Sequence, residues 1–322
     1  MTLQIKKISK SDIYIPDYNT EEDSNTELQR TEEWHLARNG SWSGSIIKGM
    51  MTCNAKGGKL KWNNLEKIFM FSEGIVKFIY TRAMQRKSNQ WIESKPNLSM
   101  KYGTAVEPLI SKIAAEELSH IGVFKEVGYK SFDDIPNAGA SSDQVIMKEE
   151  KTVAIAEYKA CVSWSSHYDR CNDNMNESSI DFWQTQVEMK AWNVDHGYYV
   201  VASPPKDISK YVYHEGDIFD LMEDFKKECF ITISKIEKSQ IHQEALIKRI
   251  EICEETCDVW IKEGGDLKEV FYEVLDKHKN NFNMNIEVIG SKTEIDVKEI
   301  AVEYKEVKAT AVSKHDFKDL PF

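Results

Sequence analysis

The sequence has no long apolar run. No stretch approaches the roughly eighteen consecutive apolar residues that mark a membrane-spanning helix. The opening segment, MTLQIKKISKSD, has no apolar core of the kind that a secretory signal peptide carries. These two absences predict a cytoplasmic protein without a membrane partner.

Paired cysteine motifs are also missing. The six cysteines are scattered and none forms a Cys-x-x-Cys pair, which argues against a zinc knuckle and against a disulfide framework. Cys253 and Cys257 lie four residues apart in a segment with helical spacing, as two ligands of a metal cluster would, but no second pair matches them. Reduced, buried cysteines are the simpler interpretation.

The chain as a whole has no excess of positive charge, since its formal net charge is -11. This value at first argues against a polyanionic partner. The charge is unevenly distributed, however: residues 30–130 hold 16 Lys and Arg against 9 Asp and Glu, whereas residues 215–322 hold 16 basic and 25 acidic residues. The distribution therefore permits a basic groove on an acidic protein.

What is present is a mixed pattern of helices and strands. Residues 64–87 and 103–119 carry apolar residues at helical spacing, and short strand-like segments follow between 121 and 160. A helix is then expected at 180–194 and a strand at 197–203. With 322 residues, the chain is long enough to bury a full core. The pattern predicts an α/β protein with a small mixed central sheet flanked by helices.

The two ends of the chain differ from this middle part. Residues 1–27 are polar and predict an irregular lead-in, so the core is expected over residues 28–240. Beyond Gly216 the chain is predicted to be helical, and residues 241–282 form a helical extension. Its two apolar stripes are Leu246, Ile250, Cys253, Cys257 and Trp260, then Leu267, Val270, Phe271, Val274 and Leu275. Residues 283–322 carry no core pattern and are assigned as a tail of uncertain order.

The segment VAIAEYKACVSW, residues 153–164, begins like a buried strand and then carries Glu157 and Lys159. Because alternate side chains of a strand share a face, these two point to the same side, about 7 Å apart along the backbone, and Tyr158 points to the other. Taken alone, the pair is explained equally well by a salt bridge at the end of a strand.

Two further carboxylates extend this pair. Asp143, in GASSDQVIM, lies at the start of the preceding strand, a hairpin's length from Glu157. Carboxylates from neighbouring strands beside a lysine are hard oxygen ligands for Mg²⁺ or Mn²⁺, an arrangement that suits phosphodiester hydrolysis. Glu107, in the expected opening turn of the helix after Gly103, is either a third acid of this site or a residue that stabilises the helix N-terminus.

Five motifs in order resemble the lambda-exonuclease or YqaJ-type viral recombinase branch of the PD-(D/E)xK nucleases. They are EWHLARNGSWSGSII, GTAVE, SSDQV, EYK and FWQTQVEM. These are similar to the family's Trp-Arg-Gly-Ser opening motif, Gly-x-x-x-Glu helix, Ser-Pro-Asp-Gly turn, Glu-x-Lys strand and aromatic-x-x-Gln-x-x-x-Met helix. Each motif is weak alone, but their order and spacing are specific. The resemblance covers residues 28–240 and implies a restriction-endonuclease-like core, although Ser142 and Gln144 replace the family's proline and glycine.

The resemblance implies a catalytic role for each matching residue. The ligands of two Mg²⁺ or Mn²⁺ ions would be Asp143, Glu157, the backbone carbonyl of Tyr158 and, at the second ion, Glu107. Lys159 would position or deprotonate the attacking water. Gln186 would help to hold that water or the lysine, with Gln184 in its place if the alignment is shifted.

The opening motif implies a site for the terminal 5′ phosphate of DNA. In the family, an arginine and a small hydroxyl residue bind this phosphate, which corresponds here to Arg38 and Ser45. A guanidinium matches phosphate oxygens, and Ser43 and Lys48 would widen the pocket. Without the resemblance, the simpler interpretation of Arg38 is a surface ion pair with Glu33 or another acidic residue of its helix.

Basic residues continue from this motif toward Glu107. Arg82 and Arg86 are the two that we assign to DNA binding. A solvated helix face is the ordinary alternative for any one of these basic residues.

The function implied by the resemblance is a metal-dependent DNA exonuclease, a hydrolase acting 5′-to-3′ on linear double-stranded DNA with a 5′ phosphate. It would leave 3′ single-stranded overhangs for phage-type recombination, in the host cytoplasm if a phage encodes it. Family members form ring-shaped homotrimers, and the resemblance implies a homotrimer here as well. The alternatives are a non-catalytic DNA-end-binding adaptor of the same fold and another PD-(D/E)xK endonuclease.

The last eight residues, HDFKDLPF, resemble the acidic tips of bacterial single-stranded-DNA-binding proteins. A terminal carboxylate and a phenyl ring suit a basic-rimmed apolar pocket on a partner. The tip would recruit a single-strand annealing protein or a host repair protein, unless the short match is incidental.

Overall fold

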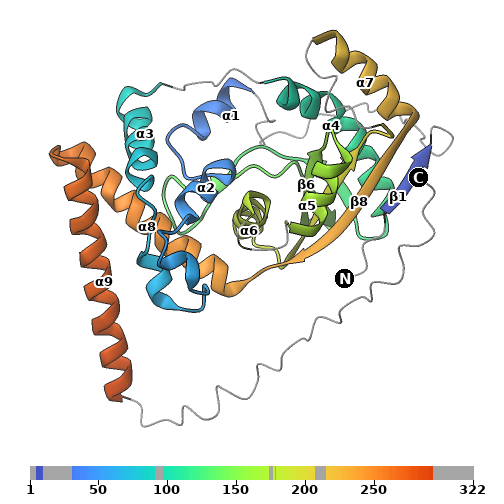
Figure 1. Ribbon diagram of the computed structural model, residues 1–322. Coiled ribbons are helices and arrows are strands. Elements are labelled where there is room, and N and C mark those ends of the chain that lie inside the picture. Colours follow the sequence, from blue (N-terminus) through green and yellow to red (C-terminus); the bar gives the residue numbers. More distant parts are fainter. Residues whose placement is uncertain are drawn as a thin grey trace. The chain divides into compact units, whose positions relative to one another are not determined.

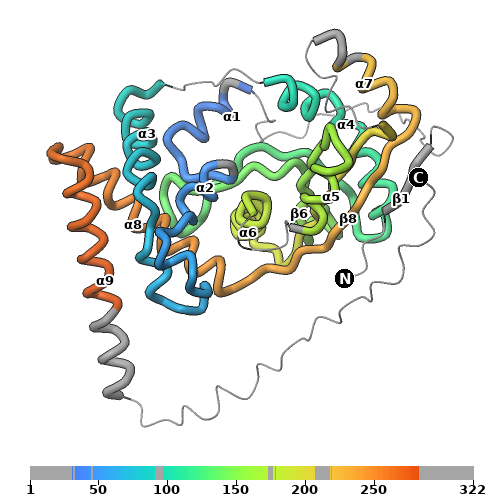
Figure 2. Tube along the Cα trace, in the orientation of Figure 1, coloured from blue at the N-terminus to red at the C-terminus, as the bar shows by residue number. Residues whose placement is uncertain are grey.

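The computed structural model describes residues 5–9, 31–90, 97–173, 177, 179–206 and 215–292 (Figures 1 and 2). The chain divides into two units, Met1–Leu275 and Asp276–Phe322. The described part of the second unit is the end of the last helix. The HDFKDLPF tip lies outside the described residues. Within the described ranges, no helix combines the length and the apolar character needed to cross a membrane.

The elements alternate between helices and strands along the chain. The strands are β1 (Ile5–Ser9), β2 (Val123–Glu126), β3 (Lys130–Ser131), β4 (Gly139–Ala140), β5 (Gln144–Lys148), β6 (Lys151–Ala160), β7 (His196–Ser203) and β8 (Glu228–Glu237). The α-helices are α1 (Glu32–Ala37), α2 (Gly44–Met51), α3 (Ile75–Ser88), α4 (Leu98–Glu117), α5 (Trp164–Asp173), α6 (Ile180–Trp192), α7 (Glu215–Lys227), α8 (Gln240–Glu263) and α9 (Leu267–Lys292). Short 3-10 helices are η2 (Gly57–Lys59) and η3 (Leu65–Phe69).

A six-stranded mixed sheet forms the centre of the first unit, in the order β1-β8-β7-β6-β5-β2. β6 and β7 run parallel, and the other neighbours are antiparallel. β3 and β4 form a separate two-stranded sheet. The β5–β6 hairpin closes through Glu149 and Glu150, which both have positive φ angles, 50° and 63°, as a tight turn between twisted strands requires. The mixed central sheet predicted from the sequence is confirmed.

Helices cover both faces of this sheet because the alternate residues of its central strands are apolar on both sides. Ala156 and Tyr158 of β6 pack with Val200 and other residues against α4 and α7. On the other face, Ile155 and Tyr199 join a second cluster that includes residues of α5 and α6. α6 therefore lies between the sheet and α2 (Figure 1).

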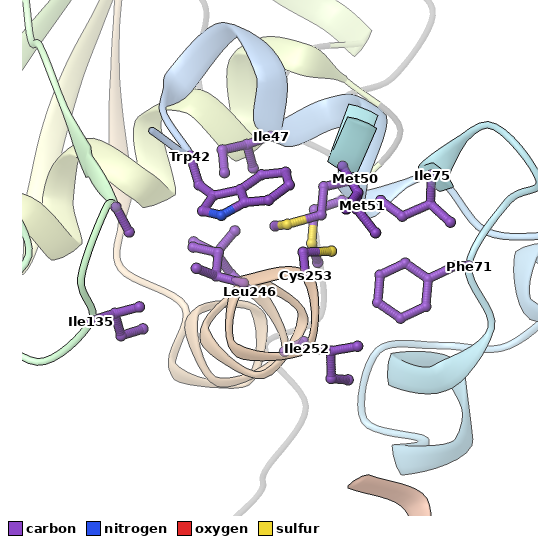
Figure 3. Close-up of a cluster of buried hydrophobic side chains, with 14 of the residues drawn as sticks. Trp42, Ile47, Met50, Met51, Phe71, Ile75, Ile135, Leu246, Ile252 and Cys253 are labelled. Atoms are coloured by element: carbon purple, nitrogen blue, oxygen red, sulfur yellow. The ribbon is translucent and has the colours of Figure 1, made fainter. Parts of the chain in front are cut away.

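The largest hydrophobic cluster lies beyond α6 and joins α2, α3, α8 and the first turns of α9. Figure 3 shows Trp42, Met50 and Leu246 converging where α2 meets α8, and α8 runs beside α3 (Figure 2). Both predicted apolar stripes of the helical extension belong to this cluster. Cys253 and Cys257 are buried and free, which agrees with their interpretation as structural residues.

Four local predictions differ from the structure. The first is the tail predicted over 283–322, because α9 continues as a helix to Lys292, ten residues into that segment. The chain after Gly216 is not all helical, because β8 follows α7 directly; its CFITISKI segment is rich in β-branched residues, which favour strands. Residues 5–9 of the predicted irregular lead-in form β1, which pairs with β8. The helix predicted over 64–87 is divided into η3 and α3.

Candidate active site

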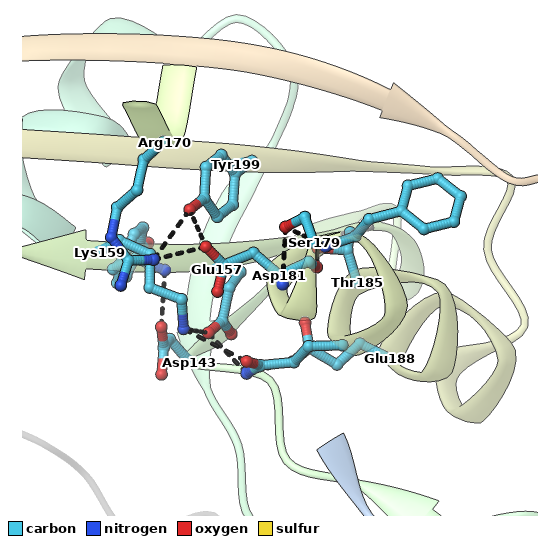
Figure 4. Close-up of polar contacts among 12 residues, drawn as sticks. Asp143, Glu157, Lys159, Arg170, Ser179, Asp181, Thr185, Glu188 and Tyr199 are labelled. Atoms are coloured by element: carbon cyan, nitrogen blue, oxygen red, sulfur yellow. Dashed lines mark hydrogen bonds and ion pairs between the residues drawn. The ribbon is translucent and has the colours of Figure 1, made fainter. Parts of the chain in front are cut away.

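The β5–β6 hairpin brings Asp143 next to Glu157 and Lys159. Asp143 immediately precedes β5, and the two other residues lie two apart on β6. Oδ2 of Asp143 accepts a 2.6 Å hydrogen bond from the backbone N–H of Tyr158, the residue between them. Figure 4 shows the three charged side chains close together beside β6. The structure therefore assembles the central part of the predicted site.

Gln184, on α6, joins the two β6 side chains. The Lys159 ammonium donates a hydrogen bond to Oε1 of Glu157 and forms an ion pair with it. Nε2 of Gln184 donates to the same Oε1 at 2.6 Å, and Oε1 of Gln184 accepts from Nζ of Lys159 at 3.3 Å. Each of the three side chains is thus held by the other two, and the Glu157 carboxylate is 1% exposed.

Gln186, the glutamine assigned first to this site, points elsewhere. Two residues along an α-helix correspond to a rotation of about 200°, so Gln184 and Gln186 project from nearly opposite sides of α6. The Gln186 amide donates to the carbonyl of Glu237 at 3.1 Å and accepts from the backbone N–H of Ser239 at 2.9 Å. It fastens α6 to the end of β8, and Gln184, the alternative assignment, lies at the site.

Glu188 is a site residue that the sequence analysis missed. It follows Gln184 by one helical turn, and its Oε1 accepts from the same Nε2 at 3.0 Å. Glu188 is fully buried, and its Oε2 has no hydrogen-bond partner; Oε2 of Glu157 has none either. The i, i+4 spacing from Gln184 is the signal that points to Glu188, but only once residue 184 rather than 186 is placed in the site.

The carboxyl groups of Asp143, Glu157 and Glu188 outnumber the one ammonium group, that of Lys159, in this cluster. Burial, followed by repulsion from Glu157, raises the pKa of Asp143 well above its ordinary value, and the same causes raise the pKa of Glu188. Burial alone would lower the pKa of Lys159, but attraction by Glu157, Asp181 and Asp143 raises it above its usual value. Lys159 is therefore an ammonium ion at neutral pH, and it does not balance the carboxylates around it.

A second polar network lies behind the lysine and was also missed. Asp181, in the first turn of α6, is buried and pairs with Arg170 of α5. The Tyr199 hydroxyl donates to Asp181 Oδ2 at 2.5 Å, and NH1 of Arg170 lies 3.3 Å from that hydroxyl (Figure 4). Because the charge of Asp181 acts on Lys159, this network adds to the field that keeps the lysine protonated.

Glu107 borders the site, although its helical position differs from the prediction. α4 begins at Leu98, with Asn97 as its N-cap, so Glu107 lies in the middle of the helix rather than in its opening turn. Its charge contributes to the raised pKa of Asp143. The helix-capping alternative is therefore wrong, and a role of Glu107 as a ligand of a second metal ion stays a prediction.

Gln144, which stands where the resembled family has glycine, fastens α4 to the β5–β6 hairpin. Its Oε1 accepts from Ser111 of α4 at 2.9 Å and from the Tyr158 hydroxyl at 2.5 Å. The backbone N–H of Tyr158, not its carbonyl, contacts Asp143. A role of its carbonyl as a metal ligand stays a prediction.

The donor set suits a divalent cation. Among the described residues, no group of three or more His, Cys, Asp or Glu side chains is already arranged around a metal position. Asp143 and Glu157 nevertheless supply hard oxygen ligands, and a buried carboxylate oxygen without a partner, such as Oε2 of Glu157, is costly unless a cation or donor satisfies it. Glu107 and Glu188 add negative charge at the margin. The residues present therefore fit Mg²⁺ or Mn²⁺.

The opening motif lies against the loop that leads into Asp143. Thr31 caps α1, and Nε1 of Trp34 donates to the Ser141 hydroxyl at 2.9 Å, two residues before Asp143. The Arg38 guanidinium lies 4.0 Å from the centre of the Trp34 ring. Nε of Arg38 is buried without a hydrogen-bond partner, and burial lowers the pKa of this side chain.

The N-terminus of α2 adjoins Gln184. A Cβ atom on Gly44 would lie 3.2 Å from Cγ of Gln184, so the backbone passes close to the site. Ser43 is the buried N-cap residue, and its side chain makes no capping hydrogen bond. Free N–H groups at a helix N-terminus favour an anion. Ser45 is the second residue of α2, with a side chain outside the described part, and Lys48 lies exposed on the same helix.

Arg82 and Arg86 of α3 have different surroundings. Arg86 donates to both carboxylate oxygens of Glu254, at 3.0 and 2.6 Å, so this predicted DNA contact is engaged inside the protein. Nε of Arg82 is buried without a partner. Burial, with the positive charges of Arg86 and Arg38, lowers the pKa of Arg82 to about 10. Arg82 and Arg38 therefore remain as candidates for binding an anion.

Replacing Glu188 by glutamine is expected to stabilise the metal-free protein at neutral pH. Because the folded-state pKa of Glu188 is raised, its contribution to stability is present below the unfolded pKa of about 4.3 and is lost as the pH rises through the folded value. Thermal unfolding followed by circular dichroism in a chelator, from about pH 5 to about pH 8, should show a shallower loss of stability for Glu188→Gln than for the wild type. If the unfolding temperatures of Glu188→Gln and the wild type fell equally with rising pH, this prediction would be contradicted.

A scan against models of protein families finds no match for the sequence, and neither does a search of curated protein sequences. Among solved structures, the chain is similar to an alkaline exonuclease (LHK-Exo) from Laribacter hongkongensis, with a TM-score of 0.51 and 17% identity over 72% of this chain and 95% of that one. The same exonuclease in complex with dAMP matches equally well. A phage-related exonuclease from Haemophilus somnus 129PT gives a TM-score of 0.48 and 14% identity over 70% of this chain and 96% of that one.

The likeness to LHK-Exo concerns the fold. At 17% identity and a TM-score of 0.51, it shows that the chain shares the fold of that exonuclease, in agreement with the mixed α/β architecture predicted from the sequence. The alignment spans nearly the whole of the exonuclease and leaves about a quarter of this chain unmatched.

Proposed function

We propose that this protein is a metal-dependent deoxyribonuclease that degrades linear double-stranded DNA from its ends, in the 5′-to-3′ direction. The observation that carries the proposal is the cluster of Asp143, Glu157, Lys159 and Gln184, in which a buried carboxylate oxygen lacks a partner beside a fixed ammonium ion. The shared fold with an alkaline exonuclease supports it.

The protein would hold Mg²⁺, or Mn²⁺, at Asp143, Glu157 and the Tyr158 carbonyl, with Glu107 directed to a second ion. When bound, the ions supply Lewis-acid neutralisation of the charge that develops on the scissile phosphate and the leaving oxygen. Asp143 and Glu157 need to be ionised for this role, and the cation would lower the raised pKa that burial and mutual repulsion give to Asp143.

Lys159 acts as a donor in this mechanism. With its pKa raised, the ammonium keeps its proton near neutral pH, so it is better suited to orienting the attacking water or a phosphate oxygen than to removing a proton. Gln184 fixes the direction of that donor, because it accepts from Lys159 and donates to Glu157 at the same time. The water's proton would then pass to solvent or to a phosphate oxygen.

The end of the substrate would bind beside this cluster. Arg38 and Arg82 are half-buried, and their buried Nε atoms have no hydrogen-bond partner. The N-terminus of α2 at Ser43 and Ser45 offers backbone N–H groups. A terminal 5′ phosphate matches both kinds of donor. Since this site adjoins Gln184, it would place the first phosphodiester bond of a duplex near the carboxylates. A ring-shaped homotrimer would add processivity.

The test is a comparison of linear and covalently closed circular duplex DNA, each in Mg²⁺ or in a chelator. We expect linear DNA to disappear only in Mg²⁺, faster with a 5′ phosphate than with a 5′ hydroxyl, while circles stay intact. A 5′ label should appear at once as a mononucleotide, and a 3′ label should remain on a long strand. Cleavage of the circles would indicate an endonuclease instead, and binding of ends without hydrolysis would indicate an adaptor.

A further inference from the structure

Arg86 connects α3 to the turn that follows Arg38. Its Nε donates to the carbonyl of Gly40 at 2.9 Å. Gly40 has a φ of +69°, and a Cβ on it would lie 2.5 Å from Cγ of Arg86, so the arginine stem packs directly on this turn. The conformation of the segment after Arg38 therefore depends on where Arg86 is held.

Glu254, on α8, holds Arg86 and two further groups. Its carboxylate accepts both guanidinium bonds of Arg86, the indole N–H of Trp42 at 2.7 Å and the side-chain amide of Asn137 at 2.5 Å. Glu254 is 5% exposed, so these are buried, charge-assisted bonds. The Glu254 carboxylate thus binds side chains from three segments: α3, the turn before α2 and the loop before β4.

These three segments lead to the candidate phosphate site. Trp42 immediately precedes Ser43, the N-cap of α2. Its backbone N–H donates a 2.7 Å hydrogen bond to the carbonyl of Asn137, beside an isolated β-bridge between Trp42 and Ala138. Arg82 lies one helical turn before Arg86 on α3. Because Glu254 neutralises Arg86, the two nearby guanidinium groups with unpartnered Nε atoms, Arg38 and Arg82, are left to bind an external anion.

We propose that Glu254 is a positioning residue for the 5′-terminal phosphate of DNA, acting through Arg86 and the Gly40 turn to fix the donors around Arg38, Arg82 and the α2 N-terminus. The inference rests on the proposed function. It assigns to α8, which follows the segment that resembles the nuclease family, an indirect part in recognising the substrate end. A carboxylate that served only to brace the core would affect folding but would not distinguish one DNA end from another.

The test compares Glu254→Gln with the wild type on duplexes with a 5′ phosphate and with a 5′ hydroxyl. Glu254→Gln loses the charge-assisted hydrogen bonds around Glu254, so KM for the duplex with a 5′ phosphate should rise by about 10- to 100-fold. The variant's kcat, and its KM for the duplex with a 5′ hydroxyl, should stay nearly unchanged. Glu254→Asp, which keeps the charge, should restore part of the preference. Glu251→Gln is the matched control, since Glu251 also lies on α8 but pairs with Lys248 at the surface.

Binding without hydrolysis separates this inference from the proposed function. Fluorescence anisotropy of both duplexes in a chelator gives the ratio of their dissociation constants for each variant. The inference stands if Glu254→Gln lowers that ratio toward one, even should the wild type hydrolyse nothing. It is overturned if the variant keeps the wild-type ratio, if both ends lose affinity equally, or if the wild type itself shows no preference.

Discussion

Replacing Asp143 by alanine is expected to lower the rate of linear DNA degradation by on the order of 10³-fold or more, because the variant loses one of the two carboxylates that would hold the cation. The change also removes the acceptor of the Tyr158 N–H and reduces the negative charge around Glu157. We would measure acid-soluble nucleotide release from a 5′-phosphorylated linear duplex in Mg²⁺ under single-turnover conditions. Calorimetric titration with Mn²⁺ should show weaker binding to the variant.

Asp133→Ala is the matched control for this experiment. Asp133 is an exposed aspartate in the loop between β3 and β4, ten residues before Asp143 in sequence. The Asp133→Ala variant should degrade DNA at the wild-type rate. If Asp143→Ala, folded as judged by circular dichroism, were as active as Asp133→Ala, the hairpin carboxylates would not be the catalytic centre.

The central hairpin was predictable because its signals are local. Strand periodicity places Glu157 and Lys159 on one face, and the short distance in sequence from Asp143 allows only a tight connection. The fold class follows from the same periodicity, since a central sheet with apolar residues on both faces requires helices on both sides. These parts of the prediction depended on residues less than twenty positions apart.

The helical side of the site was harder because a helix changes face with every residue. A shift of two positions exchanges Gln184 for Gln186. Gln184 is bonded to Lys159 at the candidate site, whereas Gln186 fastens α6 to the end of β8. Glu188 was missed for the same reason. The motif identified the right helix but did not determine which of its faces meets the sheet; that is decided by packing against α2 and α8.

Polar contacts between residues far apart in sequence have no pattern in the local sequence that predicts them. Arg86 reads from the sequence as a basic residue on a solvated or DNA-binding helix face, and only its contact with Glu254, 168 positions later, reveals the internal role. Arg249 is similar. It lies on the same apolar stripe as Leu246 and Cys253, a position where a charged residue needs partners that periodicity cannot supply.

Those partners of Arg249 lie on two segments far away in sequence. Its guanidinium donates to the carbonyl of Met50, in the last turn of α2, at 2.7 Å. It also donates to the carbonyls of Lys67 at 2.8 Å and Ile68 at 2.9 Å, both in η3. The side chain is fully buried, and its guanidinium carbon lies 4.9 Å from the centre of the Trp62 ring and 4.3 Å from that of the Phe71 ring. Burial lowers the pKa of Arg249, and these carbonyls and rings stabilise the charge in place of water.

Replacing Arg249 by methionine is therefore expected to reduce the free energy of unfolding by about 3–5 kcal/mol, because it leaves several buried carbonyl groups without donors. Urea unfolding followed by tryptophan fluorescence should show a lower midpoint, and Arg249→Lys should recover little, since an ammonium cannot reach all of the acceptors that the planar guanidinium does. Lys248→Met is the control: Lys248 pairs with Glu251 at the surface, so its loss should change stability by less than about 1 kcal/mol. Equal midpoints for the two methionine variants would mean that Arg249 does not fasten α8 to α2 and η3. In that case the attachment of α8, and with it the placement of Glu254, would depend on apolar packing alone.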